Sequence, residues 1–138
     1  MVAAVFGSVP PRLPNAPTEP DGSTINTLRR VAKAEQAWLA VQTWADVLGA
    51  IPNPDSMRSI GTALVIGTVL DGLGAQLQAG QATQRVALTA ATMGRPAKAM
   101  PQVLQQAGNR NALRELIGGG LWPQAVLDLP PARRFSQA

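Results

Sequence analysis

The sequence of 138 residues predicts an all-α fold, a helical hairpin or small bundle with one long Gly/Ala/Gln-rich helix and extended proline-rich arms at both ends. Three observations support this prediction. Apolar residues between positions 31 and 48 recur at alternating spacings of three and four, as on one face of a helix. Residues 57–93 have the composition of a long helix, and Gly94 and Pro96 follow as end signals. Prolines gather near both ends of the chain.

The proline pattern also divides the chain into three parts. Residues 1–22 contain five prolines, which fix φ and remove amide donors, so we expect an extended arm there. Residues 23–120 form the predicted helical domain. Residues 121–138, with Pro130 and Pro131, form a predicted extended C-terminal tail.

The first predicted helix covers residues 23–48. Ser23 or Thr24 can cap its start, and Gly49 suits the position after its end. Two tryptophans, Trp38 and Trp44, point partly different ways on such a helix, so one of them can anchor a subunit contact. The predicted apolar seam consists of Val31, Ala34, Trp38, Val41, Ala45 and Leu48.

The second predicted helix covers residues 57–93, either as one rod or as two pieces broken near Gly72 and Gly74 or near Gly80. A single rod would be roughly 55 Å long. Two short helices, at about residues 101–107 and 111–117, follow, each closed by glycine. The tail after them is expected to be extended apart from one short turn.

Within the long segment, residues 60–75 are apolar and rich in small residues. About 11 residues precede Asp71, which is short of the roughly 20 that a membrane-spanning helix needs. We therefore favour a helix buried in an oligomer core, with an interfacial or re-entrant membrane helix as the alternative. Asp71 itself either lies on an exposed helix face or is buried beside an arginine.

The residue content excludes several kinds of site. The chain has no histidine and no cysteine, so Ser–His–Asp and Cys–His catalysis, thiolate zinc sites and disulfides are excluded. The glycines at 72 and 74 lack the spacing of a dinucleotide-binding loop, and those at 118–120 are not followed by a P-loop lysine. No catalytic residue, metal ligand or cofactor is predicted, and the sequence indicates a protein that is not an enzyme.

The net charge of +4 and the pI of about 11.1 are compatible with an anionic partner. The arginines are scattered, however, and only Arg29–Arg30 and Arg133–Arg134 form pairs. Nucleic acid is therefore expected at most as a non-specific partner, and a membrane at most as a transient one.

Residues 61–74, a Gly/Ala-rich apolar stretch, run directly into the Gln/Ala-rich residues 74–85. This composition resembles that of the small internal virion (ejection) proteins of short-tailed bacteriophages. The resemblance implies a structural subunit that lies inside the capsid near the portal, contacts DNA and neighbouring subunits, and leaves with the genome. It covers about 30 residues and transfers no residue role.

The functional prediction is thus a non-enzymatic assembly subunit, a bacteriophage virion protein acting through helix packing and terminal arms. The alternative is a bacterial membrane-associated or secretion-machinery subunit that uses residues 60–75. Homo-oligomers and contacts with other structural subunits are expected, with a location in the virion, or otherwise in the cytoplasm or at a membrane. The candidate interface residues are Val31, Trp38, Val41, Trp44, Leu48, Gly61, Gly67, Leu70, Gly74 and Trp122.

Overall fold

A four-stranded antiparallel sheet lies at the centre of the molecule, so the predicted all-α class is wrong and the fold is mixed α/β. The computed structural model describes residues 22–54 and 61–131. The strand order is β1-β2-β4-β3. In chain order the elements are α1 (Gly22–Ala34), β1 (Trp38–Thr43), α2 (Trp44–Ala50), β2 (Thr62–Thr68), α3 (Leu73–Thr92), β3 (Lys98–Ala99), α4 (Gln102–Gln105), α5 (Asn109–Leu116) and β4 (Trp122–Leu129).

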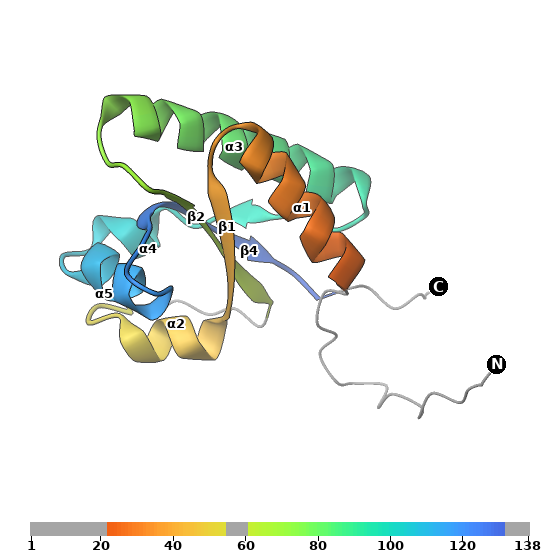
Figure 1. Cartoon of the computed structure of the whole chain (residues 1–138). Helices are drawn as coiled ribbons and strands as arrows, with labels where there is room; N and C mark the ends of the chain where they lie inside the picture. The colour runs from red at the N-terminus through yellow and green to blue at the C-terminus, as the bar shows by residue number, and fades with distance from the viewer. Residues whose placement is uncertain (1–21, 55–60, 132–138) are drawn as a thin grey trace.

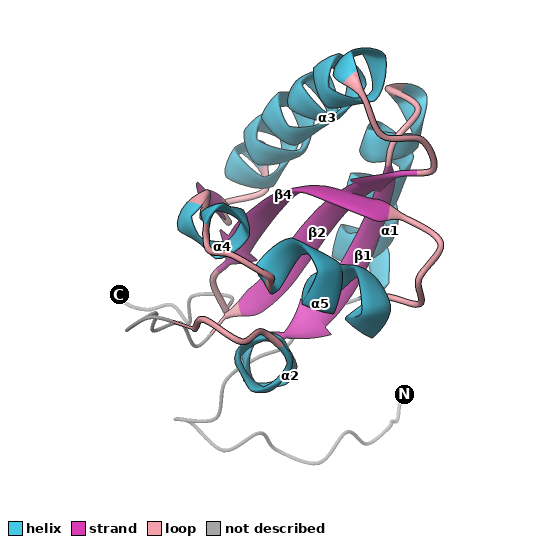
Figure 2. Cartoon of the chain, turned by 90° about the vertical axis from the view of Figure 1, so that its left-hand side faces the viewer, coloured by secondary structure: helices cyan, strands magenta, loops and turns pink. Residues whose placement is uncertain are grey.

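Helices cover both faces of the sheet (Figures 1 and 2). On one face α1 and α3 pack against alternate strand residues such as Leu64, Ile66 and Leu127. On the other face α2, α4 and α5 pack against the intervening residues, among them Val65 and Val126. The described part of the chain therefore has three layers and two apolar cores, with β2 buried on both of its sides.

The predicted helix over residues 23–48 is interrupted. It begins as expected, with α1 at Gly22, but ends at Ala34. Gln36 then takes a left-handed backbone conformation with φ of 63°, and the chain turns into β1. Leu39 and Val41 face one core and Ala40 faces the other, so this stretch has the two-residue period of a strand.

The predicted helix over residues 57–93 is correct only in its second part, where α3 spans Leu73–Thr92 as one continuous helix. The apolar stretch before it forms β2 instead. A strand buried on both faces is apolar at every position, and over a length of a few residues it cannot be told from a buried helix by periodicity. The β-branched side chains of Val65 and Ile66 favour the strand.

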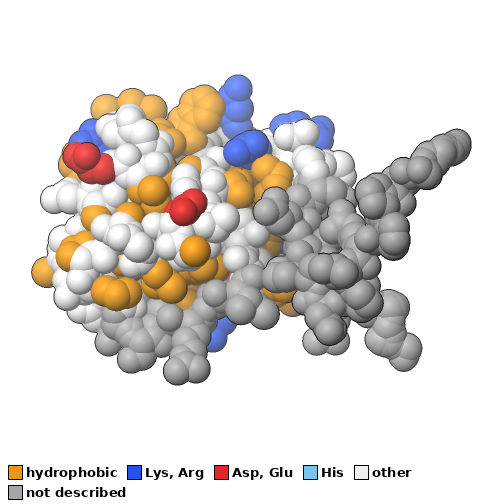
Figure 3. Space-filling model, turned by 90° about the horizontal axis from the view of Figure 1, so that it is seen from below, with side chains coloured by type: hydrophobic (Ala, Val, Ile, Leu, Met, Phe, Trp, Pro, Cys, Tyr) orange, Lys and Arg blue, Asp and Glu red, His pale blue; other side chains and the backbone are white. Residues whose placement is uncertain are grey.

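Because residues 62–68 form a strand, a membrane helix over residues 60–75 is also wrong. Within the ranges that the structure describes, no helix has both the length and the apolar character needed to cross a bilayer. Only 14% of the residues in the sequence are charged. In keeping with this, uncharged side chains cover most of the described part of the surface that Figure 3 shows.

The two short helices predicted near residues 101–107 and 111–117 are confirmed in place as α4 and α5. Gly94 has φ of 77° after α3, as the end signal indicated. Residues 122–129 of the expected extended tail form β4, which pairs with both β2 and β3. The proposed N-terminal arm lies outside the described residues except for Gly22.

Candidate functional site

The ten candidate interface residues are distributed over different environments. Three of them, Trp38, Leu70 and Gly74, are exposed. Trp44 is only 3% exposed and its Nε1 donates a hydrogen bond of 2.8 Å to Asp128 Oδ1, so it belongs to the core. Whether any of the ten contacts a partner stays a prediction. Those that are buried or half-buried are Val31, Val41, Trp44, Leu48, Gly61, Gly67 and Trp122.

An irregularity in the sheet marks a different part of the molecule. Consecutive residues of β2, Ile66 and Gly67, pair with Ala125 and Pro123 of β4, so Gln124 is an extra residue in a β-bulge. Bulges redirect side chains and are frequent beside functional sites. Here the Gln124 amide Nε2 donates to Thr68 Oγ1 and to an oxygen of Asp71, each at 3.0 Å.

Asp71 connects this bulge to α5. Its two carboxylate oxygens accept hydrogen bonds from Arg110 at 2.7 and 3.0 Å, and Arg110 Nε donates to the carbonyl of Pro123 at 3.0 Å. These bonds from Arg110, together with the one from Gln124, lower the pKa of Asp71 from 3.8 to about 2. Asp71 thus has the arginine partner considered in the sequence analysis, but it lies in the loop before α3, with about a third of its side chain exposed.

Trp122 supports the same arrangement. The guanidinium groups of Arg110 and Arg114 lie 5.1 and 4.0 Å from the centroid of its ring, which are cation–π distances. The start of β4, the loop before α3 and α5 are therefore held together by one polar network, and the position of Gln124 depends on it.

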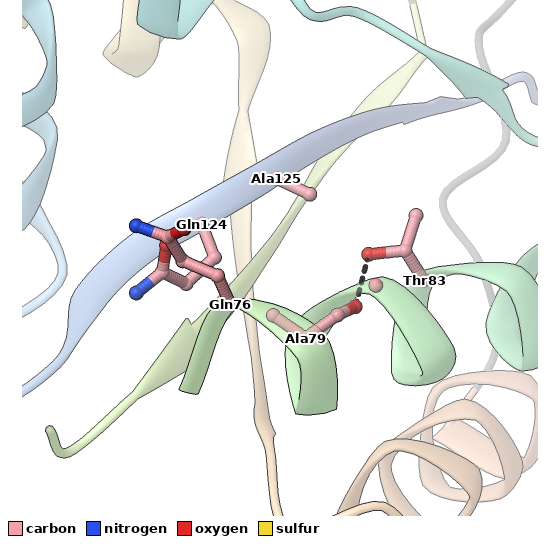
Figure 4. A pocket seen from close by; sticks show the side chains of 6 residues that line it. Gln76, Ala79, Thr83, Gln124 and Ala125 are labelled. Carbon is pink, nitrogen blue, oxygen red and sulfur yellow. Dashed lines mark hydrogen bonds between the residues drawn. The ribbon is translucent and has the colours of Figure 1, made fainter. Parts of the chain in front are cut away.

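Beside Gln124 lies a cleft of about 420 Å³ between α3 and β4, which we call the α3–β4 cleft. Figure 4 shows the amides of Gln76 and Gln124 at one end of it. Thr83 lies farther along α3, and its hydroxyl donates to the carbonyl of Ala79 at 2.7 Å. The cleft is lined by Gln76, Ala79, Gly80, Thr83, Gln124 and Ala125.

A second cleft, of about 280 Å³, lies on the other side of the same strand segment and shares Gln124 and Ala125 with the first. It exists because β3 is only two residues long and pairs with residues 127 and 128 of β4. A single further bond, from the Met100 amide to the Val126 carbonyl at 2.8 Å, continues this edge. Toward Gln124 the described chain provides no further strand, so backbone groups of β4 are open to a ligand.

The α3–β4 cleft contains amides, a hydroxyl and small apolar groups, and none of its lining residues is charged. Such a lining can bind and orient a flat polar ring through hydrogen bonds, but it offers no side chain that titrates near neutral pH. None of the residues that line this cleft was among the candidates predicted from the sequence. Gln76 and Thr83 lie two helical turns apart, with the small residues Ala79 and Gly80 on the same side of the helix, and this spacing was a signal in the sequence. The position of Gln124, by contrast, depends on the bulge.

Comparisons with known proteins identify the fold. An FMN-dependent nitroreductase from Clostridium difficile R20291 superposes with a TM-score of 0.65 at 12% identity over 89% of this chain and 83% of that one. A protein from Parabacteroides distasonis, provisionally assigned as an NADH dehydrogenase/NAD(P)H nitroreductase, has a TM-score of 0.64 at 14% identity. The match covers 88% of this chain and 84% of that one. A provisionally assigned nitroreductase in complex with FMN, from Desulfovibrio desulfuricans, has a TM-score of 0.61 at 14% identity. The match covers 87% of this chain and 80% of that one. Neither a family model nor a curated protein sequence matches the chain.

These similarities overturn the functional prediction from the sequence. The structures that this fold is similar to are oxidoreductases, which contradicts both the bacteriophage structural subunit and the expectation of a protein that is not an enzyme. The compositional resemblance misled because its apolar part, taken as a small-residue helix, contains a sheet strand. The alternative of a secretion-machinery subunit depended on the same helix and is wrong for the same reason.

Proposed function

We propose that this chain is a subunit of a flavin-dependent oxidoreductase that takes electrons from NAD(P)H, and that the α3–β4 cleft holds the flavin ring. The observation that carries the proposal is this uncharged cleft beside the bulge at Gln124, in a fold similar to that of FMN-dependent nitroreductases. A cofactor carries the redox chemistry in such enzymes, and the protein supplies binding, orientation and electrostatics.

The lining fits the ring of a flavin. The amide of Gln76 offers a donor and an acceptor to the carbonyl and imide groups of the ring. The two N–H groups of Gln124 bond to Thr68 and Asp71, so Gln124 offers its side-chain carbonyl oxygen as an acceptor for the imide N–H. Ala79, Gly80 and Ala125 are small, so they leave room for a planar group between α3 and β4. Because Gln124 is fixed by Thr68 and Asp71, its amide is already oriented before a ligand binds, which reduces the cost of ordering it.

The same lining does not fit a phosphate, since no lysine or arginine belongs to it. We therefore assign the cleft to the ring alone. When bound, a flavin supplies two-electron transfer. The residues of the cleft bind the ring, orient it and exclude water from one side, and none of them is assigned a proton-transfer role.

Titration of the purified chain with FMN, followed by quenching of the flavin fluorescence, tests the proposal. We expect saturable binding in the micromolar range or tighter, about −8 kcal/mol or more. Thr83→Leu should weaken it at least about tenfold, because the longer side chain enters the cleft. This change spares the fold, since the Thr83 hydroxyl bonds only within its own helix.

Thr92→Leu is the matched control. Thr92 also donates to a carbonyl of α3, is exposed, and lies at the end of the helix outside the cleft. It should bind FMN within about twofold of the unmodified chain. FMN that fails to bind, or that binds Thr83→Leu and the unmodified chain equally, would refute the assignment. With FMN bound, oxidation of NAD(P)H in the presence of a quinone or nitroaromatic acceptor tests the reaction class.

A further inference from the structure

A third cleft, of about 350 Å³, lies between the start of β1, the end of β2 and the first turns of α3. We call it the Trp38 cleft, after the largest side chain that lines it. It shares no lining residue with the α3–β4 cleft. Its volume falls within the range of about 300–1,000 Å³ that is typical of small-molecule sites. The cleft is lined by Gln36, Trp38, Thr68, Val69, Leu70, Gly74, Ala75 and Gln78.

Trp38 gives this cleft a flat aromatic wall. The side chain is 45% exposed, whereas Trp44 is only 3% exposed and belongs to the core. An exposed indole offers both a ring for stacking and an N–H donor at its edge. Trp38 is therefore suited to contact a planar ligand.

Gln36 has a strained backbone at the same place. Its φ of 63° makes it the one residue other than glycine, within the ranges that the structure describes, with a positive φ. Glycine would adopt this conformation without strain. Residues held in such conformations gather at binding and catalytic sites, where the position of the side chain matters more than the local strain. Here the side chain of Gln36 lines the cleft.

Two amides supply the polar groups of the cleft. Gln78 Nε2 donates to Gln36 Oε1 at 2.8 Å, which leaves the amide N–H groups of Gln36 and the carbonyl oxygen of Gln78 for a ligand. Thr68, by contrast, is already engaged. Its hydroxyl donates to the carbonyl of Leu70 at 2.6 Å and accepts from Gln124 at 3.0 Å. None of the lining residues is charged, so a ligand would be recognised by stacking and by neutral hydrogen bonds.

A purine base has the matching chemistry. Its two fused rings have a shape close to that of indole, and bases stack readily on aromatic side chains. Adenine carries its 6-amino donor beside a ring-nitrogen acceptor, and side-chain amides of glutamine bind this pair of groups. The three-ring system of a flavin is larger, in keeping with its assignment to the larger α3–β4 cleft of about 420 Å³.

We infer that the Trp38 cleft binds a purine base, as in adenosine, which stacks on Trp38 and forms hydrogen bonds with the amides of Gln36 and Gln78. The inference does not depend on the proposed flavin site, because adenosine contains no flavin and the two clefts have no lining residue in common.

NMR titration of the ¹⁵N-labelled full chain with adenosine tests this inference. We expect saturable shifts of the Trp38 indole N–H and of the side-chain amides of Gln36 and Gln78, with a Kd below about 1 mM. Purine riboside has the same rings and sugar but lacks the 6-amino donor. It should bind at least about fivefold more weakly, since the carbonyl oxygen of Gln78 would then have no partner.

Variants of Trp38 test the stacking. Trp38→Leu should weaken adenosine binding at least about tenfold, and Trp38→Phe should recover part of the loss, because phenylalanine restores an aromatic ring. Leu88→Ala is the control, at a position of α3 that is 62% exposed and lies outside the cleft. It should bind adenosine within about twofold of the unmodified chain. Circular dichroism checks that each variant is folded.

Gln36→Gly separates binding from stability. Glycine relieves the positive φ, so the Tm of this variant should equal or exceed that of the unmodified chain. Because the variant lacks the amide, it should bind adenosine at least about fivefold more weakly. Absence of adenosine binding, shifts centred outside the cleft, or binding that is unchanged in Trp38→Leu or in Gln36→Gly would overturn the inference.

Discussion

Replacing Asn109 is expected to destabilise the fold more than any single exposed polar change. Asn109 begins α5, is fully buried, and makes three hydrogen bonds of 2.9 Å. Its Oδ1 accepts from the amide of Asn53, and its Nδ2 donates to the carbonyls of Asn53 and Val103. It thus ties the loop after α2 to α4 and α5, on the sheet face away from α3.

The magnitude follows from these three bonds. Asn109→Ala removes one side of each bond and leaves the backbone groups of Asn53 and Val103 without that partner. At about 1 kcal/mol per bond, the free energy of unfolding should fall by about 3 kcal/mol. For a chain of this size that corresponds to a decrease in Tm of roughly 10 °C.

Urea unfolding followed by tryptophan fluorescence measures the loss, and the three tryptophans provide the signal. The matched control is Asn111→Ala, an identical change two positions farther along α5 at an exposed site. It should alter the free energy of unfolding by less than about 0.5 kcal/mol. If Asn109→Ala costs less than about 1 kcal/mol, the buried network is not a determinant of stability and the reasoning is refuted.

Asn109→Asp adds a dependence on pH. An aspartate there can accept from Asn53 but, when ionised, cannot donate to the two carbonyls, and burial raises its pKa above the unfolded value of about 3.9. The folded state then binds the proton more tightly, so the variant should be least stable above the raised pKa and recover as the pH falls toward about 4. The unmodified chain should lack this recovery.

Three further outcomes are expected. Asp71→Asn should lower the free energy of unfolding at pH 7. Because the pKa of Asp71 is lowered in the folded state, its carboxylate stabilises the fold above pH 3.8, and this contribution is lost as the pH falls to about 2, where the two chains should be equally stable. Acid titration followed by circular dichroism measures the difference between them, and a difference that stays constant with pH would contradict the prediction. Gly61→Ala should destabilise the chain, since a Cβ at that position would lie 2.9 Å from the carbonyl carbon of Leu129, and a Tm equal to that of the unmodified chain would contradict the packing. Ile66→Ala, at a fully buried position of β2, should lower the free energy of unfolding by about 3 kcal/mol in urea, and a loss below about 1 kcal/mol would indicate that this strand is not central.

The positions where helices begin and end were predicted from the sequence more accurately than the fold class was. The ends at Gly94 and Gly118 are correct, because a positive φ after a helix depends on the local residue type. Gly108 also has a positive φ, but it precedes α5, and α4 already ends at Gln105. The start of α1 at Gly22 lies within one residue of the predicted start, but Ser23 and Thr24 lie inside the helix and not at its cap. These features require no knowledge of distant parts of the chain.

The strands were missed because their evidence is non-local. Residues 62–68 are apolar throughout since β2 is covered on both sides, and the sequence does not reveal those two covers. Trp38 and Val41 match a helical seam as well as a strand, and only the left-handed Gln36 between α1 and β1 separates the two. The missed sheet led directly to the wrong class of protein.

The candidate site was less accessible still. Asp71 was recognised as exceptional, and its arginine partner was one of two alternatives, but Arg110 is 39 residues away in the chain. Gln124 has no distinguishing neighbours in the sequence, since its role comes from the bulge opposite Ile66 and Gly67. Neutral glutamines also carry no signature comparable to a histidine or cysteine motif.

The most direct test of the proposed site is an NMR titration of the ¹⁵N-labelled chain with FMN. We predict that the largest shifts occur in the side-chain amides of Gln76 and Gln124 and in the backbone amides of Gly80 and Ala125, which line the α3–β4 cleft. Another cleft, of about 350 Å³, lies beside Trp38 and Leu70. Shifts centred there, or no shifts at saturating FMN, would contradict the assignment of the flavin ring to the α3–β4 cleft.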